Sequence, residues 1–421
     1  HMYYTAETRV AKITGPEVHL ISGSLNLYTT VLDYNLGTDI SNYYNRGTVI
    51  DKENKLISDI GTYFRRQNNF IFIRKVVFND KKHTIYTDTL EYNTETQIVK
   101  FRGPTTIVGP DGIMKADQGE YDSKAKTSNF RGRARIVYSG FILNADKVYY
   151  DQFSQVGKAA GNVEIFSIKD SVTIFGDYAN YWGTTGRSKV FPSALMQSVS
   201  GGDTLFLTSD TLYAVNDTVK KEKKVYAYHH VKVFNKNMQA ICDSLIYNQI
   251  DSSLTFFKDP VLWNTKNQMR GDTVIVYTKN KKIEKILLNN KAFAISLDTI
   301  ANHNQVKGKK MTAFFKENKV NKIDVKGNSE SIYYALQGDT VASGLNRVES
   351  EDMSVRFAMQ KINTIAFYKK PKAVFIPPHE IKEEDKRLKG FKWRDGERPT
   401  KEAVLGKYLK KSTTTKQKKK K

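Results

Sequence analysis

The chain has 421 residues and carries 67 Lys and Arg against 44 Asp and Glu, a formal net charge of +23. Its 24 Tyr, 22 Phe and 3 Trp exclude wholesale disorder, and its one cysteine, Cys242, excludes an internal disulfide framework and a cysteine-based zinc site. No apolar run approaches the roughly 18 residues that a membrane-spanning helix needs.

The N-terminal residues precede the regular part of the sequence. His1-Met2 is typical of a cloning remnant, so we expect that a signal peptide preceding Tyr3 has been removed. Residues 8–47 contain stretches in which apolar and polar residues alternate. We expect these stretches to form the first strands of the fold.

A repeated motif, Asp-x-x-x-Tyr, organises residues 59–277. The aspartates of the motif and of its two degenerate copies are Asp59, Asp88, Asp117, Asp146, Asp177, Asp210, Asp243 and Asp272. Their successive spacings are 29, 29, 29, 31, 33, 33 and 29 residues. A fixed period of this kind predicts stacked copies of one structural unit.

Each repeat contains two segments with the alternation of a β-strand. After the aspartate the inward positions are residues such as Leu90 and Tyr92, and the next segment has Thr105 and Ile107. Short polar turns separate the segments. Gly103, like its counterparts in the next two repeats, predicts a bulge or bend in the second strand.

These patterns predict an all-β fold, an elongated solenoid-like open β-jellyroll built from two-strand repeats of about 29–33 residues. The repetitive body is expected to cover residues 3–376. A basic, partly helical or disordered extension is expected over residues 377–421, with helices at 382–388 and 401–410 and a cap at Thr400.

The repeated pattern (Ala/Gly)-Asp-x-h-x-Tyr, followed by h-x-Gly-x-h-x-h with h apolar, resembles the OstA/LptA group of periplasmic lipopolysaccharide-transport proteins. Residues 145–150 and 160–165 match it most closely. The resemblance implies a jellyroll folded like a taco, whose apolar groove carries lipid acyl chains from the inner to the outer membrane. It also implies a periplasmic location and end-to-end strand pairing.

We therefore predict a non-enzymatic periplasmic carrier or bridge that binds the acyl chains of lipopolysaccharide or lipid A in an apolar groove. The predicted groove-lining residues are Tyr92, Phe101, Ile107, Tyr121, Phe130, Ile136, Tyr150, Val163, Ile165 and Tyr181. Other lipopolysaccharide-transport proteins, bound by edge-strand pairing, and a head-to-tail homo-oligomer are the predicted partners. No cofactor, metal, catalytic residue or nucleic acid is expected.

Two other classes of protein remain open at this point. One is a polysaccharide-acting enzyme with a right-handed parallel β-helix, and the other is a structural or scaffold β protein with anionic partners. The repeated aspartates could line a cation site, but capping of turns is the commoner use of such residues. We therefore expect them to be structural.

Overall fold

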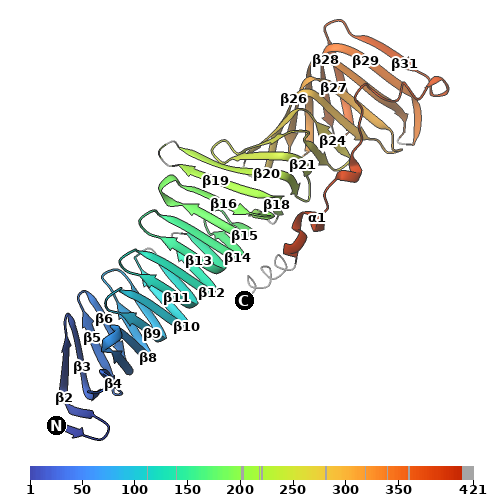
Figure 1. Cartoon of the computed structure of the whole chain (residues 1–421). Helices are drawn as coiled ribbons and strands as arrows, with labels where there is room; N and C mark the ends of the chain where they lie inside the picture. Colours follow the sequence, from blue (N-terminus) through green and yellow to red (C-terminus); the bar gives the residue numbers. More distant parts are fainter. Residues whose placement is uncertain are drawn as a thin grey trace. The chain divides into compact units, whose positions relative to one another are not determined.

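The structure is a computed structural model that describes residues 1–409 except 111, 139, 201–202, 218, 220, 280–281, 318, 339 and 359–360. The chain forms two compact units, residues 1–188 and residues 189–421. Both units consist of antiparallel strands that mostly follow one another in chain order, as Figure 1 shows. No helix among the described residues is long and apolar enough to cross a membrane.

The first unit contains β1 to β15 and two 3-10 turns. Their bounds are β1 Met2–Thr5, β2 Val10–Ser22, β3 Leu25–Asn35, β4 Ile40–Tyr43, β5 Gly47–Asp51, β6 Asn54–Ser58, β7 Ile60–Phe64, β8 Asn69–Asn79, β9 Thr84–Asn93, β10 Ile98–Gly109, β11 Gly112–Asp122, β12 Thr127–Tyr138, β13 Phe141–Asp151, β14 Val156–Ser167 and β15 Val172–Trp182, with the turns at Arg65–Gln67 and Gly183–Thr185.

Strand β16, Arg187–Phe191, includes the boundary between the units, and the second unit continues to α1. Its elements are β17 Ala194–Ser200, β18 Asp203–Ser209, β19 Thr211–Asp217, β20 Glu222–Phe234, β21 Gln239–Asn248, β22 Ser253–Phe257, β23 Val261–Asn264, β24 Asn267–Arg270, β25 Thr273–Lys279, β26 Lys282–Leu297, β27 His303–Lys316, β28 Lys319–Gln337, β29 Val341–Ala358, β30 Lys361–Tyr368, β31 Lys372–Ile376 and α1 Lys401–Leu405, with 3-10 turns at Pro378–Glu380, Asp395–Glu397 and Gly406–Tyr408.

The two-strand repeat and its bend are confirmed in the first unit. Strand β10 pairs antiparallel with both β9 and β11, and its register shifts between Arg102 and Thr105, around the predicted glycine. The same shift recurs in β12 and β14. Antiparallel pairing of consecutive strands is incompatible with a parallel β-helix, in which neighbouring strands run in the same direction. That alternative fold is therefore wrong.

The bend explains why the aspartate and the glycine recur together. Gly132 has φ +74°, and a Cβ at this position would lie 2.9 Å from the Cβ of Asp117 on the neighbouring strand. The next residue, Arg133, donates from Nε to Asp117 Oδ2 at 3.1 Å. Asn162 likewise donates to Asp146 Oδ2 at 2.8 Å. In these two repeats the aspartates are structural, as predicted, because each holds the bend of the following strand.

The sheet of each unit folds over at these bends, so it has an inner and an outer face. In β10 the inner side chains Val99, Phe101, Thr105 and Ile107 are buried, whereas Lys100 and Arg102 are exposed. We call the strand ends that follow Tyr92, Tyr121 and Tyr150 the tyrosine edge. The opposite ends, at residues 80–83, 109–112 and 138–141, are the isoleucine edge.

A C-terminal strap, residues 377–409, crosses the outer face of the second unit. Three buried glutamines on β21, β24 and β27, Gln239, Gln268 and Gln305, bind the strap. Gln268 Nε2 donates to Lys392 O at 2.7 Å, and Gln268 Oε1 accepts from Arg394 N at 2.7 Å. In Figure 1 the strap passes β24 and reaches α1.

The strap only partly matches the expected helices. A helix forms at Lys401–Leu405, where Ala403 N donates to Thr400 Oγ1 at 3.2 Å, so the cap is confirmed. The helix predicted over residues 382–388 is wrong. There the backbone N–H of Leu388 donates to Gln305 instead of to a helical carbonyl. The end of the predicted extension, residues 410–421, lies outside the described residues.

Candidate functional site

The ten predicted groove residues come together on the inner face of the first unit. The tyrosine ladder joins Tyr92, Tyr121, Tyr150 and Tyr181 through the cross-strand neighbours Val99, Ser128 and Gly157. The isoleucine ladder joins Ile107, Ile136 and Ile165 through Met114 and Leu143. Phe101 and Phe130 flank Gly119, and Val163 lies beside Gly176. The sequence alternation therefore placed all ten side chains on one face.

Exposure rises along the two ladders of this inner face, whereas Phe130 and Val163 are buried. Tyr92 is 0% exposed, Tyr121 is half-buried, and Tyr150 and Tyr181 are 36% and 47% exposed. Ile107 is buried, whereas Ile136 and Ile165 are half-buried. Tyr150 and Tyr181 are therefore not part of a buried core. Their role in binding stays a prediction.

Small side chains line the inner face beside the bends of β11 to β15. These positions, which we call the floor, are Ala116, Ala134, Ala145, Ala159, Gly176 and Ala179, and all are buried. The earlier strands carry large residues at the inner face, including Phe70, Phe72 and Phe78, each 0% exposed. A small-residue floor under half-exposed ladders can accept an apolar chain, whereas the earlier strands are filled by their own side chains.

A buried polar cluster closes the inner face at β9. The Tyr92 hydroxyl donates to Asp51 Oδ2 at 2.7 Å, and Ser24 Oγ donates to Asp51 Oδ1 at 2.7 Å. Asn54 Nδ2 donates to the Tyr92 oxygen at 3.2 Å. Burial, together with the hydrogen bond to the Asp51 carboxylate, raises the pKa of Tyr92 well above its usual value. Tyr92 therefore acts as a polar partner inside a packed core.

A second contact joins the two edges one repeat later. The ring of His83, at the isoleucine edge, meets the ring of Tyr121, at the tyrosine edge, with centroids 6.0 Å apart in a T-shaped geometry. The backbone N–H of His83 donates to the carboxylate of Asp80. Burial, with a smaller contribution from the charge of Asp80, raises the pKa of Tyr121 to about 12. Tyr121 is thus neutral at physiological pH.

Sequence reasoning missed several residues of this site. Tyr138 and Phe141 are cross-strand partners on the same face as Ile136 and Leu143, and they are 49% and 48% exposed at the isoleucine edge. Their signal was an aromatic residue on each side of the turn that contains Gly140. His83 and Asp51 had no comparable signal, because their partners lie 38 and 41 residues away.

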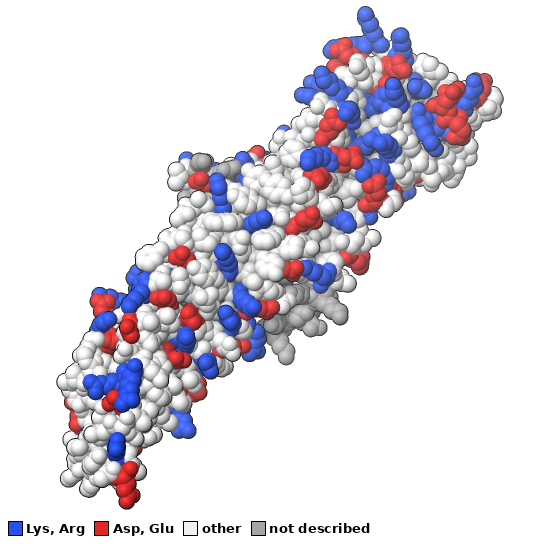
Figure 2. Space-filling view, in the orientation of Figure 1, with Lys and Arg blue, Asp and Glu red and all other residues white. Residues whose placement is uncertain are grey.

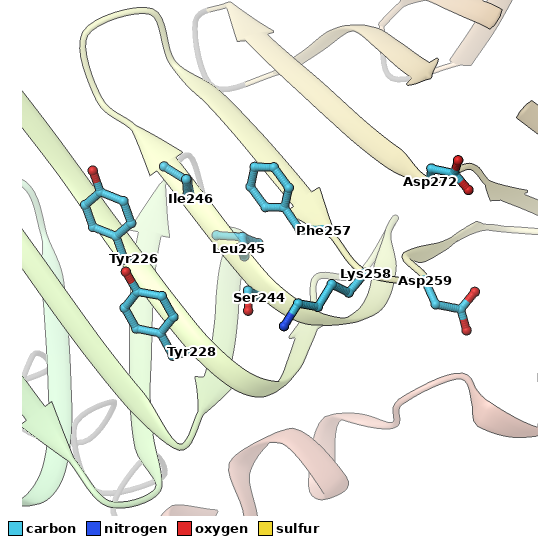
Figure 3. A pocket seen from close by; sticks show the side chains of 9 residues that line it. All are labelled: Tyr226, Tyr228, Ser244, Leu245, Ile246, Phe257, Lys258, Asp259 and Asp272. Carbon is cyan, nitrogen blue, oxygen red and sulfur yellow. The ribbon is translucent and has the colours of Figure 1, made fainter. Parts of the chain in front are cut away.

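The second unit contains a pocket of about 600 Å³ on its outer face (Figure 3). Tyr226 and Tyr228 form one wall, with their rings stacked 6 ° from parallel and centroids 6.1 Å apart. Phe257 lies across from them, and Lys258 and Asp259 border the pocket. Asp259 is already engaged, because Arg394 of the strap donates to it at 2.7 Å. One border residue of the pocket therefore already binds the strap.

Among the described residues, neither charge nor metal-binding chemistry marks a competing site. Within the described ranges, no group of three or more His, Cys, Asp or Glu side chains is arranged to hold a metal ion. Burial raises the pKa of the Cys242 thiol to about 12, so the thiol is protonated at neutral pH. Lys and Arg alternate with Asp and Glu over the face in Figure 2. The inner face of the first unit thus remains the best candidate site.

Sequence profiles of two protein families match the chain across both units. A family described as OstA-like protein matches residues 1–84 and 72–146. A family described as LptA/(LptD N-terminal domain) LPS transport protein matches residues 114–282. The chain belongs to the OstA/LptA-like proteins. The matched ranges include all ten predicted groove residues of this OstA/LptA-like chain.

A solved structure also matches. It is LptH of Pseudomonas aeruginosa, described as the LptA-homologous periplasmic component of the lipopolysaccharide transport device. The match has 14% sequence identity and a TM-score of 0.18, and it covers 34% of this chain and 80% of LptH. No curated protein matches the chain.

Proposed function

We propose that this chain is a non-enzymatic periplasmic carrier that binds the acyl chains of lipopolysaccharide on the inner face of its first unit. The observation that carries the proposal is the half-exposed isoleucine ladder above a floor of small residues on β11 to β15. The match to the LptA/(LptD N-terminal domain) LPS transport family supports the class of ligand.

The chemistry of this face suits a lipid chain. Ile136 and Ile165 present aliphatic surface, and Tyr121, Tyr150 and Tyr181 lie at the tyrosine edge. Burial of an acyl chain would stabilise the complex by about 0.8 kcal/mol for each methylene removed from water. Binding of this kind needs no bond to be made or broken, and any hydroxyl at the edge can face a sugar or phosphate group.

Edge-strand pairing with other transport proteins is the proposed mode of assembly. Strand β1 pairs with β2 and exposes Met2, Tyr3 and Tyr4. A strand at a sheet edge presents backbone donors and acceptors that another chain can pair with. The same geometry would allow a head-to-tail homo-oligomer.

The double variant Ile136→Glu/Ile165→Glu tests the site. Charges at these positions should reduce binding of lipopolysaccharide in a vesicle-free binding assay by at least tenfold, because a buried carboxylate opposes an apolar ligand. Val137→Glu/Phe166→Glu is the matched control, since these residues are also half-buried, are adjacent in sequence and point to the opposite face. Equal binding by both folded variants would refute the proposed site.

A further inference from the structure

The inner face of the first unit differs sharply between its early and late strands, and this difference bears on where a lipid can go. From β3 to β10 the inner side chains are buried, and they include large ones such as Tyr43, Phe70, Phe72, Phe78 and Phe101. Tyr63, Phe70 and Phe72 stack in sequence, with centroids 4.4 Å and 5.0 Å apart. Packing of this density leaves no room for an acyl chain unless the core rearranges.

Two contacts also join the edges of the folded sheet over this region. Tyr92 at the tyrosine edge bonds Asp51, which ends β5 at the opposite edge. Tyr121 meets His83 in the turn between β8 and β9. The His83 ring also covers the end of β10, because a Cβ on Gly109 would lie 2.7 Å from His83 Cδ2. We call Tyr92–Asp51 and Tyr121–His83 the two edge latches.

We propose that the two edge latches and the neighbouring stacked rings form a stop, so that acyl chains lie only on β12 to β15. This inference rests on the proposed function and limits its site. The binding path is then closed at its N-terminal end. Tyr92, Phe101 and Ile107 support the stop and do not touch lipid, while Ile136 and Ile165 do.

The length of the path follows from the strand spacing. Strands β12 to β15 are separated by three intervals of about 4.8 Å, so the path extends for roughly 14 Å along the stacking direction. A path with one closed end cannot pass a lipid along the whole unit. Lipid must enter and leave at the late strands or sideways between the exposed edges, which carry Tyr138 and Phe141 on one side and Tyr181 on the other.

Site-specific photo-crosslinking to lipopolysaccharide tests the stop in the full chain. A benzophenone side chain replaces Ile107, Ile136 or Ile165, and Tyr86, exposed on the outer face, serves as the background position. Crosslinking should be at least tenfold above background at Ile136 and Ile165 and at background at Ile107. Crosslinking at Ile107 equal to that at Ile165 would overturn the stop while leaving the proposed function intact. No crosslinking at any position would overturn both.

Opening the second latch should increase crosslinking at a position that the stop otherwise protects. His83→Ala/Tyr121→Ala should raise crosslinking at Ile107 at least threefold, because it removes the ring contact between the edges. His19→Ala/Tyr28→Ala is the control, since it removes a comparable stacked pair, at 4.4 Å, that joins β2 to β3. An unchanged signal at Ile107 in the first variant would count against the stop.

Hydrogen exchange tests the stop on the unsubstituted chain, so the result does not depend on whether a variant folds. Addition of lipopolysaccharide should slow amide exchange in β12 to β15 and leave β8 to β10 unchanged. Slowing of equal size in both groups of strands would overturn the stop.

Discussion

The two units use the same bent antiparallel repeat but differ at the inner face. In the second unit one inner ladder runs across seven strands through Leu245, Phe256, Val274, Leu288, Met311, Val325 and Met353, and each is buried. In the first unit the floor of β11 to β15 consists of Ala and Gly, and the neighbouring ladders are half-exposed. The backbone therefore provides a folded sheet, and side-chain size decides whether it is filled.

The outer faces differ as well. In the second unit an outer ladder of Gln239, Trp263, Gln268, Ile295, Gln305 and Ile332 is buried under the strap. Leu388 of the strap packs with Phe293 and Leu345, and Phe391 and Trp393 contact the same cluster. The corresponding ladder in the first unit includes Val108 and Ile113, which remain exposed. The strap makes the second unit a three-layer structure, which favours a structural role for it.

Removal of the strap should produce the largest effect. Truncation after Ile376 exposes the outer ladder and removes the buried Leu388, Leu405 and Tyr408. At about 1.5–3 kcal/mol for each large apolar side chain, we expect the second unit to lose at least about 5 kcal/mol of unfolding free energy. Urea unfolding followed by circular dichroism measures this loss. Truncation after Leu409, which retains every described contact of the strap, is the control; equal stability of the two truncated chains would contradict the structural role.

Tyr92→Phe should have a smaller effect, confined to the first unit. It removes the hydroxyl that donates to the buried Asp51 carboxylate and costs about 1–3 kcal/mol of unfolding free energy. The urea midpoint of the first unit reports the change, and Tyr86→Phe on the exposed outer face is the control. Lipopolysaccharide binding should not change, and a tenfold loss of binding by folded Tyr92→Phe would show that the closed end contacts lipid.

The stability of the second unit should depend on pH through Asp243, one of the aspartates at the bends. Hydrogen bonds from Ser244, His229 and Lys258 hold the pKa of Asp243 well below its usual value near 3.8. A depressed pKa means that the folded state favours the ionised carboxylate, so this contribution is present above about pH 4 and is lost as the pH falls further. Asp243→Asn should therefore flatten the decline of the urea midpoint below about pH 4. A decline as steep as that of the parent chain would rule out Asp243 as a source of the pH dependence.

The smallest expected effect concerns how fast a maleimide reacts with a thiol on each of the two inner faces. Cys242 lies opposite Val231 on the filled inner face of the second unit, and burial raises its pKa to about 12. We expect a maleimide to leave it unlabelled in the native protein and to label it in urea. In Cys242→Ala/Ile165→Cys, the new thiol on the half-exposed face should react at least tenfold faster. Equal rates would remove the distinction between the two inner faces.

The sequence predicted the local architecture because the relevant residues are close together in the chain. Asp117 and Gly132 belong to one repeat, and their spacing follows directly from a bend shared by paired strands. Alternation likewise assigned Ile136 and Tyr150 to the inner face. Alternation does not say how much space lies opposite a face, so it gave equal weight to the filled position of Ile107 and the half-exposed position of Ile165.

Contacts between distant residues could not be predicted. The strap meets Gln239 through Arg398, 159 residues later, and no motif marks either residue. The edge latches join residues that lie 38 and 41 positions apart, and they form only when the sheet folds over. A single sequence identifies such residues as apolar but does not reveal which of them meet.

The central claim is that this OstA/LptA-like chain carries a glycolipid on the inner face of its first unit. Native mass spectrometry of the protein purified from a Gram-negative periplasm tests it most directly. We predict an adduct with the mass of a lipid A-type molecule that is lost in Ile136→Glu/Ile165→Glu and retained in Val137→Glu/Phe166→Glu. A chain that stays free of lipid after incubation with lipopolysaccharide would contradict the claim and favour a structural role for both units.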